Sequence, residues 1–410
     1  MAKTQTLTFK RTVNASPAEV HRAFTNSTAL REWLCEAAQA DSRRGGRLHL
    51  WWSSGYYMIG EYTALEPGKK AGFTWHGRGE PEATRVTVSL KAKSGRRFPS
   101  GDVTEVTLSH GGVGSGKKWA KSRKEIEGGW PTALENLQSV LETGRNLRFT
   151  LRPMLGISLD EFNADVAAKL GLPVTQGNRL SGVVEGLGAH AAGLQKDDVL
   201  VSLGGRKLAN LASLPAAMQG RRAGDKVKVV FYRGREKRTV VMELSPRPLP
   251  DVPPMAKELT EAVRKVYAET NAELEACFQG VNEAEASHHP APGEWNAKEV
   301  LAHLIVDERD NQRWIADLVG GHEGWYDDWG GNVYPRLAGL TTAYPTVAAL
   351  LEELKRNQTE ITAALAALPP EFVARKGSYW RLGHSLLNLA SHAREHLDQI
   401  QAAVQAGRRQ

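Results

Sequence analysis

Five closely spaced prolines divide this sequence into two parts of different pattern. Before them, short alternating apolar runs separated by Gly and Pro indicate strands. After them the strand signals stop, and apolar residues recur at helical spacing to the end. Proline fixes φ and removes a backbone donor, so we expect a stiff linker over residues 247–255. The prolines are Pro246, Pro248, Pro250, Pro253 and Pro254.

Length and charge both predict a modular chain. A chain of 410 residues is too long for one hydrophobic core. The net charge is +8 over residues 1–145, +7 over 146–250 and −8 over 251–410. The densest basic run, 117–124, is more typical of a solvated face than of a phosphate-binding patch, so we do not expect a nucleic-acid partner.

The low cysteine content and the lack of long apolar segments predict the cellular compartment. Its two cysteines, Cys35 and Cys277, do not form a disulfide framework, which fits a reducing cytoplasm. The first residues lack the apolar stretch of a secretory signal, and no run is long and apolar enough to span a bilayer. We therefore expect a cytoplasmic protein without a membrane partner.

Residues 1–145 read as an α+β domain. A capping box at 16–19 opens a helix over 20–33, strand-like runs follow from 47 to 110, and a helix over 118–143 ends at Gly144. This outline resembles the START-like (SRPBCC) helix-grip fold, in the branch related to the activator of heat-shock-protein ATPase. The matching residues are Ser16-Pro17-Ala18-Glu19-Val20, Leu30, Trp33, Gly45-Gly46-Arg47-Leu48, Gly129-Trp130, Leu134 and Leu137.

The resemblance implies a cavity between the last helix and the sheet that takes a small apolar ligand. Trp51, Tyr57, Trp75 and Trp130 are the aromatic residues we predict to line it. The alternative is that these side chains simply fill the core. His49, His76 and His110 show no metal-ligand spacing and are treated as ordinary polar residues.

Residues 147–246 resemble a PDZ domain of the bacterial protease-associated type. A strand is expected over 147–151, and the most specific match is the run 189–200, AHAAGLQKDDVL. The resemblance implies a groove in which a partner's C-terminal peptide adds as a strand. The carboxylate loop would be Met154, Leu155, Gly156 and Ile157. Such a loop also occurs in domains that bind nothing free, or that bind a neighbouring domain of the same chain.

Residues 256–408 predict a four-helix bundle, with helices near 256–279, 296–319, 346–367 and 383–406. His392 and His396 are four residues apart, which places both imidazoles on one helix face. His303 lies on another helix whose apolar side also turns inward. Three neutral imidazoles with an open position are typical of a catalytic metal site. A pair at this spacing on an amphipathic helix is also compatible with ordinary polar residues.

This segment resembles the DinB (damage-inducible) four-helix superfamily. The matching motifs are PGEWNAKEVLAHL over 292–304 and HAREHLDQI over 392–400. The resemblance implies a divalent metal, zinc or nickel, with His303, His392 and His396 as ligands. Dimers are common among such bundles, although nothing in this sequence specifies a homodimer.

The catalytic residues are not apparent from the sequence. Glu308 and Glu395 are candidate acid/base or supporting groups, and Glu395 is also compatible with a solvated carboxylate. His384 is expected outside the triad. The loop 325–329, WYDDW, is a candidate for substrate recognition or for capping the bundle. Two function classes remain: a metal-dependent thiol transferase or hydrolase, and a non-catalytic stress-related adaptor with a metal-stabilised platform.

Overall fold

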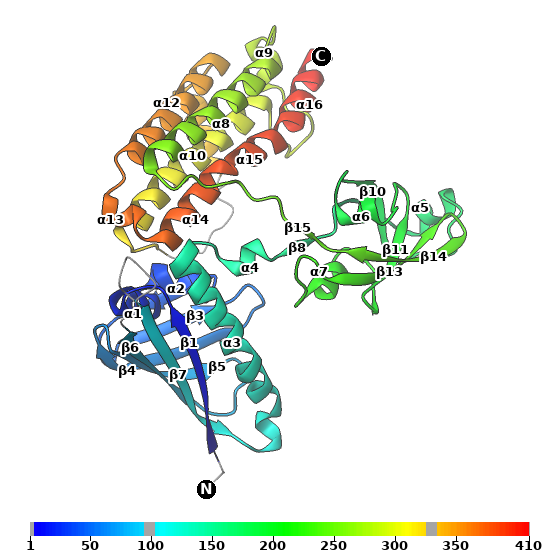
Figure 1. Cartoon of the computed structure of the whole chain (residues 1–410). Helices are drawn as coiled ribbons and strands as arrows, with labels where there is room; N and C mark the ends of the chain where they lie inside the picture. Colours follow the sequence, from blue (N-terminus) through cyan, green and yellow to red (C-terminus); the bar gives the residue numbers. More distant parts are fainter. Residues whose placement is uncertain (1–3, 94–102, 325–333, 410) are drawn as a thin grey trace. The chain divides into compact units, whose positions relative to one another are not determined.

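The computed structural model describes residues 4–93, 103–324 and 334–409. The chain forms two compact units (Figure 1). One contains Met1–Asn146 together with Pro250–Gln410, and the other contains Leu147–Leu249. The first and the last of the three predicted segments therefore share one unit. Three kinds of fold occur in the order expected: α+β, PDZ-like β-rich and all-α.

The N-terminal α+β domain is an antiparallel seven-stranded sheet in the order β1-β7-β6-β5-β4-β3-β2. Helix α3 lies across the sheet, and its buried Leu134 and Leu137 pack in one core with strand residues such as Leu108. The strands are β1 (Thr4–Val13), β2 (Ala37–Ala40), β3 (Arg47–Trp51), β4 (Tyr57–Glu66), β5 (Lys70–Gly77), β6 (Thr84–Lys93) and β7 (Val103–Gly114). The helices are α1 (Pro17–Thr25), α2 (Ser27–Trp33), the 3-10 turn η1 (Lys117–Trp119) and α3 (Ala120–Thr143).

The helix predicted over 20–33 is two helices, because Asn26 interrupts it. Asn26 is extended, at φ −111° and ψ 133°, and its side chain accepts a hydrogen bond from the Ala29 amide. A side chain that caps the next helix cannot also continue the previous one. The capping box of Ser16 with Glu19 and the left-handed Gly144 after α3 are both present as predicted.

The PDZ domain has a sheet in the order β14-β13-β11-β10-β9, with β12 beside β11, and a separate pair of β8 with β15. The run 147–151, predicted as a strand, is helical instead: the Leu151 amide bonds the Leu147 carbonyl at 3.0 Å and closes a turn. The elements are α4 (Leu147–Thr150), β8 (Pro153–Met154), β9 (Ile157–Asp160), α5 (Ala164–Lys169), β10 (Asn178–Val183), α6 (Gly188–Ala191), β11 (Val199–Leu203), β12 (Arg206–Lys207), α7 (Ser213–Met218), β13 (Lys226–Arg233), β14 (Glu236–Glu243) and β15 (Ser245–Pro246).

The C-terminal domain is built on long helices, as predicted, but the fourth is broken in two places. The Asn388 side chain donates to the His384 carbonyl at 2.8 Å and so competes with the helical ladder. His396 forms the second break. The elements are α8 (Ala256–Cys277), α9 (Glu283–Ser287), α10 (Ala297–Gly320), α11 (Tyr334–Ala343), α12 (Val347–Ala366), α13 (Pro370–Val373), α14 (Lys376–Leu387), α15 (Leu389–Glu395) and α16 (Leu397–Arg408).

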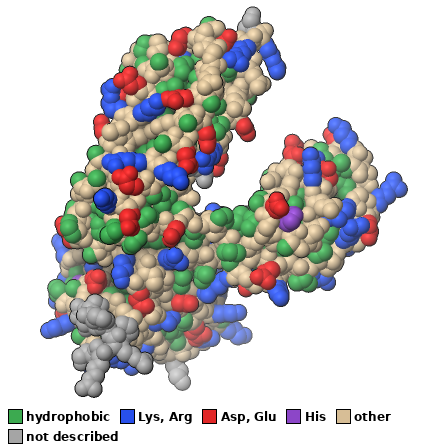
Figure 2. All heavy atoms as spheres, turned by 45° about the horizontal axis from the view of Figure 1, so that its top comes forward, with side chains coloured by type: hydrophobic (Ala, Val, Ile, Leu, Met, Phe, Trp, Pro, Cys, Tyr) green, Lys and Arg blue, Asp and Glu red, His purple; other side chains and the backbone are tan. Residues whose placement is uncertain are grey.

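The surface of the bundle is charged and mixed in sign. On the face that Figure 2 shows, Lys/Arg and Asp/Glu side chains are interspersed over the helices rather than gathered by sign. None of the helices within the described ranges combines the length and apolar character that crossing a bilayer requires.

Candidate metal centre

Helix α10 fixes the first of the three predicted ligands. Its start is set by a capping box: the Asn296 side chain accepts from the Glu299 amide at 2.9 Å, and Glu299 accepts from the Asn296 amide at 3.0 Å. His303 follows two turns later on the face that points into the bundle, and it is 6% exposed. The Trp295 ring lies 5.3 Å from the His303 ring and shields one side of it.

The other two predicted ligands come from the broken C-terminal helix. His392 belongs to α15, and His396 stands at the junction of α15 and α16. The His392 Nε2 atom lies 3.4 Å from His303 Nε2 and 3.1 Å from His396 Nε2. One ligand atom from each of the three residues lies within 4.8 Å of the other two. The structure thus brings together all three histidines that the sequence predicted.

The two Nε2 separations that involve His392 fit a tetrahedral cation. Zinc–nitrogen bonds of about 2.0–2.1 Å at a tetrahedral angle place two nitrogens about 3.3 Å apart. The two Nε2 separations bracket that value. Imidazole nitrogen is also the donor that zinc and nickel share. The donor set and its spacing are therefore both suitable for a divalent metal.

The outer nitrogens of two rings are held by acceptors. His392 Nδ1 lies 3.1 Å from the Asp307 carboxylate, and His396 Nδ1 lies 2.8 Å from Gln399 Oε1. An acceptor at Nδ1 assigns the proton to that atom and leaves the Nε2 lone pair for a metal. Asp307 was missed in the sequence. Its position four residues after His303 on α10 was the signal that could have identified it.

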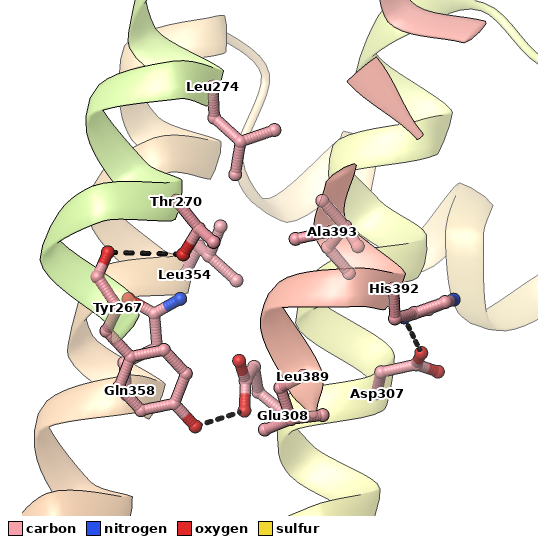
Figure 3. Close-up of a pocket in the computed structure, with 11 residues that line it drawn as sticks. Tyr267, Thr270, Leu274, Asp307, Glu308, Leu354, Gln358, Leu389, His392 and Ala393 are labelled. Carbon is pink, nitrogen blue, oxygen red and sulfur yellow. Dashed lines mark hydrogen bonds and ion pairs between the residues drawn. The ribbon is translucent and has the colours of Figure 1, made fainter. Parts of the chain in front are cut away.

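A small cavity of about 20 Å³, the size of one water molecule, lies beside His392 (Figure 3). Asp307 and Glu308 line it together with Tyr267, whose hydroxyl donates to Glu308 at 2.9 Å. Burial raises the pKa of Glu308 to about 7, and the nearby Asp307 carboxylate adds to the rise against the hydrogen bonds from Tyr267 and Gln358. A carboxyl group with this pKa exchanges a proton near neutral pH.

The remaining candidates in this domain lie elsewhere. Glu395 is exposed, which agrees with the alternative that it is a solvated carboxylate. His384 stacks on Trp380 at 4.7 Å and contacts the Asn388 side chain, outside the triad. The loop 325–329 lies outside the described residues.

The predicted peptide-binding residues of the PDZ domain surround a left-handed glycine. Gly156 has φ +74°, and a Cβ there would lie 2.4 Å from Leu187 Cβ. Leu155 is buried in the core, whereas Met154 belongs to β8. Ile157 begins β9, the last strand in the sheet order. Peptide binding itself stays a prediction.

The four predicted cavity residues of the α+β domain do not form one group. Trp75 and Trp130 are buried, and their rings lie 5.4 Å apart. Trp51 and Tyr57 are paired across β3 and β4, and Tyr57 is 40% exposed. Trp51 shares its strand face with the exposed His49, because side chains alternate along a strand. Ligand binding by this domain stays a prediction.

His110, treated as an ordinary polar residue in the sequence, is a fully buried part of this core. Its Nδ1 accepts from Trp130 Nε1 at 3.0 Å, and its Nε2 lies 2.7 Å from the Thr84 hydroxyl. Burial lowers the pKa of His110 to about 4. The sequence offered one signal: His110 alternates in phase with the apolar residues Val106 and Leu108 of β7.

Three family models match the chain. The model described as "Activator of Hsp90 ATPase homolog 1-like protein" matches residues 14–142, the PDZ domain model matches 153–244, and the DinB superfamily model matches 265–400. They occur in the order that the sequence motifs predicted. The DinB match includes His303, His392 and the residues around them.

Curated relatives match only a part of the chain. A probable periplasmic serine protease of the do/HhoA-like kind from Haemophilus influenzae is 30% identical over 108 residues, which is 26% of this chain and 22% of that protein. The periplasmic pH-dependent serine endoprotease DegQ of Escherichia coli is 35% identical over 82 residues, or 20% of this chain and 18% of that protein. The chain thus spans about a fifth of these relatives.

Two solved structures each resemble about one third of the chain. An HSP90 activator from Plasmodium falciparum is 22% identical, covers 33% of this chain and 95% of its own, and has a TM-score of 0.28. A protein from Mesorhizobium loti is 24% identical, with 34% and 97% coverage and a TM-score of 0.29. These values are too low to carry an argument, so the assignment rests on the family models. The chain joins an Hsp90-ATPase-activator-like α+β domain, a PDZ domain and a DinB-superfamily helical domain in one polypeptide.

Proposed function

We propose that the DinB-like domain binds one divalent cation, zinc or nickel, through the Nε2 atoms of His303, His392 and His396. The observation that carries this proposal is the convergence of three Nε2 atoms at separations of 3.1 and 3.4 Å for the two pairs that involve His392. The Asp307 and Gln399 acceptors at Nδ1 support it, because they hold two rings in the tautomer that ligates.

Three neutral ligands leave a position for a small molecule. A bound divalent cation supplies Lewis acidity and lowers the pKa of a water or thiol, which is the basis of a metal-dependent hydrolase or thiol transferase. In this reading Asp307 orients His392. Glu308 holds or releases a proton at the wall of the neighbouring cavity, with Tyr267 donating to it. Trp295 limits access of water to His303.

Metal stoichiometry tests the site. The full-length chain is stripped of metal, dialysed against Zn²⁺ or Ni²⁺, and analysed by inductively coupled plasma mass spectrometry. We expect one ion per chain for the wild type and less than a tenth of that for His392→Ala. His384→Ala is the matched control, because it removes a histidine of the same helical region outside the triad. Equal loading of all three proteins would refute the site.

Activity separates the two function classes. The loaded chain is assayed for hydrolysis of activated esters and for transfer of low-molecular-weight thiols to small electrophiles. Activity that disappears in Glu308→Gln while the metal stays bound supports the enzyme. A loss of melting temperature on metal removal, without any activity in the loaded protein, supports the metal-stabilised adaptor.

A second proposed function, recognition of a C-terminal peptide, is favoured by the placement of β9. It terminates the sheet order, and the glycine before it has the backbone conformation of a turn that brings amides close to a ligand. Peptide libraries with free and amidated C-termini test it on the full chain. Preference for the free carboxylate supports the groove, and equal binding of both forms contradicts it.

A further inference from the structure

The α+β domain and the helical bundle meet at helix α14. The hydroxyl of Ser378 donates to Glu32 Oε1 on α2, and both side chains are buried. Gly377 makes this approach possible: a Cβ there would lie 2.6 Å from Glu32 Oε2 and 2.7 Å from Val140 Cγ1. The Glu32 carboxyl group therefore reaches the first turn of α14, and burial raises its pKa despite the nearby Arg22 and the Ser378 hydroxyl.

A second buried carboxylate, Glu323, sits in the same junction. It pairs with Arg381 of α14 through two contacts of 2.7 Å and with Arg31 of α2 at 3.5 Å. Its backbone amide bonds the Thr28 hydroxyl at 3.3 Å. Burial alone would raise the pKa of Glu323, but Arg381 and Arg31 hold it below its usual value, so the carboxylate stays charged.

Each domain also completes the helix ends of the other. Asn26 donates to the Gly321 carbonyl at the end of α10 at 3.1 Å. Lys376 donates to the Glu142 carbonyl at the end of α3 at 2.9 Å. The last carbonyls of a helix lack partners within it, so these contacts replace water.

Such a junction resists displacement. Sliding α14 away from α2 would separate the charged Glu323 from Arg31 and leave the buried carboxyl group of Glu32 without its Ser378 partner. An unpaired buried charge is far more costly than an exposed one. The polar groups therefore hold a single arrangement of the two domains.

The junction anchors α10, which carries His303, and α14, which precedes the ligand-bearing helix α15. The anchored end of α10 at Gly321 is 18 residues after His303, or about 27 Å along the helix. On the other side, His392 is 14 residues after Ser378, with the helix break at Asn388 between them. The junction thus holds the far ends of the segments that bring His303 to the other two rings.

We propose that the α+β domain is a structural part of the metal centre, because its junction with α10 and α14 sets the spacing of the three imidazoles. This inference rests on the proposed metal site. By thermodynamic linkage, breaking the junction lowers the affinity of the site for the metal, and metal binding stabilises the junction. The α+β domain then acts on the site through the two helices and without touching the ion.

Zinc affinity in the full-length chain tests this coupling. The double variant Arg31→Ala/Ser378→Ala removes two cross-domain contacts and leaves every residue of the triad intact. We expect its zinc dissociation constant, from competition with a chromogenic chelator, to rise about tenfold. The matched control is Arg264→Ala/Ser287→Ala, which removes the same residue types from the exposed surface of the bundle. An unchanged affinity in the folded junction variant overturns the proposal.

Hydrogen exchange separates this proposal from the metal site itself. We expect zinc to slow amide exchange in α15 and also in α2 of the wild type, and only in α15 of the junction variant. If zinc slows exchange in α15 but not in α2 of the wild type, the coupling is contradicted and the proposed metal site is retained. If zinc slows amide exchange in neither α15 nor α2, both the coupling and the metal site are contradicted. Metal-free exchange then tests the junction alone, since α2 and α14 must open with the same free energy if they form one unit.

Discussion

Buried histidines occur in both the α+β domain and the bundle, and they differ in what their ring nitrogens contact. His110 has a protein partner at each nitrogen, Trp130 at Nδ1 and Thr84 at Nε2. In the triad, Asp307 and Gln399 occupy two Nδ1 atoms, while the Nε2 atoms face one another. Burial alone therefore does not distinguish a core histidine from a ligand. A core histidine and a metal ligand are distinguished by the group that the second ring nitrogen faces.

The largest expected effect is on the metal. His303→Ala removes one of the three proposed ligands, and we expect zinc affinity to fall at least a thousandfold, about 4 kcal/mol. His110→Ala should leave the affinity unchanged, because neither of its nitrogens is available. Competition titrations of both full-length variants make the comparison. Similar losses in the two variants would remove the distinction drawn between the two regions.

The reverse holds for stability. His110→Ala leaves a cavity and leaves the buried Trp130 Nε1 without its acceptor, while the Thr84 hydroxyl keeps its bond to the Trp75 carbonyl. We expect a loss of about 3 kcal/mol in the free energy of unfolding of the α+β domain. Metal-free His303→Ala should lose less, since its Nε2 faces other imidazoles. Urea unfolding at pH 7.5 without metal measures both, and the opposite ranking would count against the comparison.

Acid sharpens the same contrast. The folded pKa of His110 is about 4, below the unfolded value of 6.5, so its neutral form is favoured by folding. The contribution is complete above pH 6.5 and is lost as the pH falls toward 4. At pH 5 we expect about 2 kcal/mol less stability than at pH 7.5 from this residue. His110→Gln, which does not titrate, is the control, and identical pH profiles of the two proteins would contradict the prediction.

The smallest expected effect on zinc affinity comes from the side chains that accept hydrogen bonds from the proposed ligands. Asp307→Asn keeps the shape but weakens the acceptor at His392 Nδ1, so zinc should bind about tenfold more weakly, about 1.4 kcal/mol. Gln399→Ala removes an exposed neutral acceptor and should cost less than Asp307→Asn. Isothermal titration of the folded proteins provides both values. A larger loss for Gln399→Ala would show that the carboxylate is not the main support.

The sequence predicted those parts of the molecule that depend on local chemistry. The family order, the caps at Ser16 and Gly144, the long helices and the three histidines follow from motifs and periodicity. Asp307 also lay within reach of this logic, because a helix places residue i+4 beside residue i. Helix breaks at Asn26 and Asn388 were missed because one side chain decides each of them.

Features that depend on distant contacts were not predictable in the same way. No local pattern shows that Glu32 on α2 meets Ser378, far later in the chain. The aromatic residues illustrate a second reason. Trp51 and Trp75 have equal propensity for a sheet, and only strand register decides that they lie on different faces. Pattern reasoning therefore identified the domains but not how the first and the last combine.

The pairing of β8 with β15 has a consequence for evolution and engineering. These strands stand at the two ends of the PDZ segment, with Pro153 opposite Pro246 and Met154 opposite Ser245. The segment leaves its host unit and returns through neighbouring strands, so its ends are as close as those of a loop. A domain whose two ends lie this close together can be inserted, exchanged or removed as a unit. After removal, a few glycine and serine residues would join the two ends of the remaining chain.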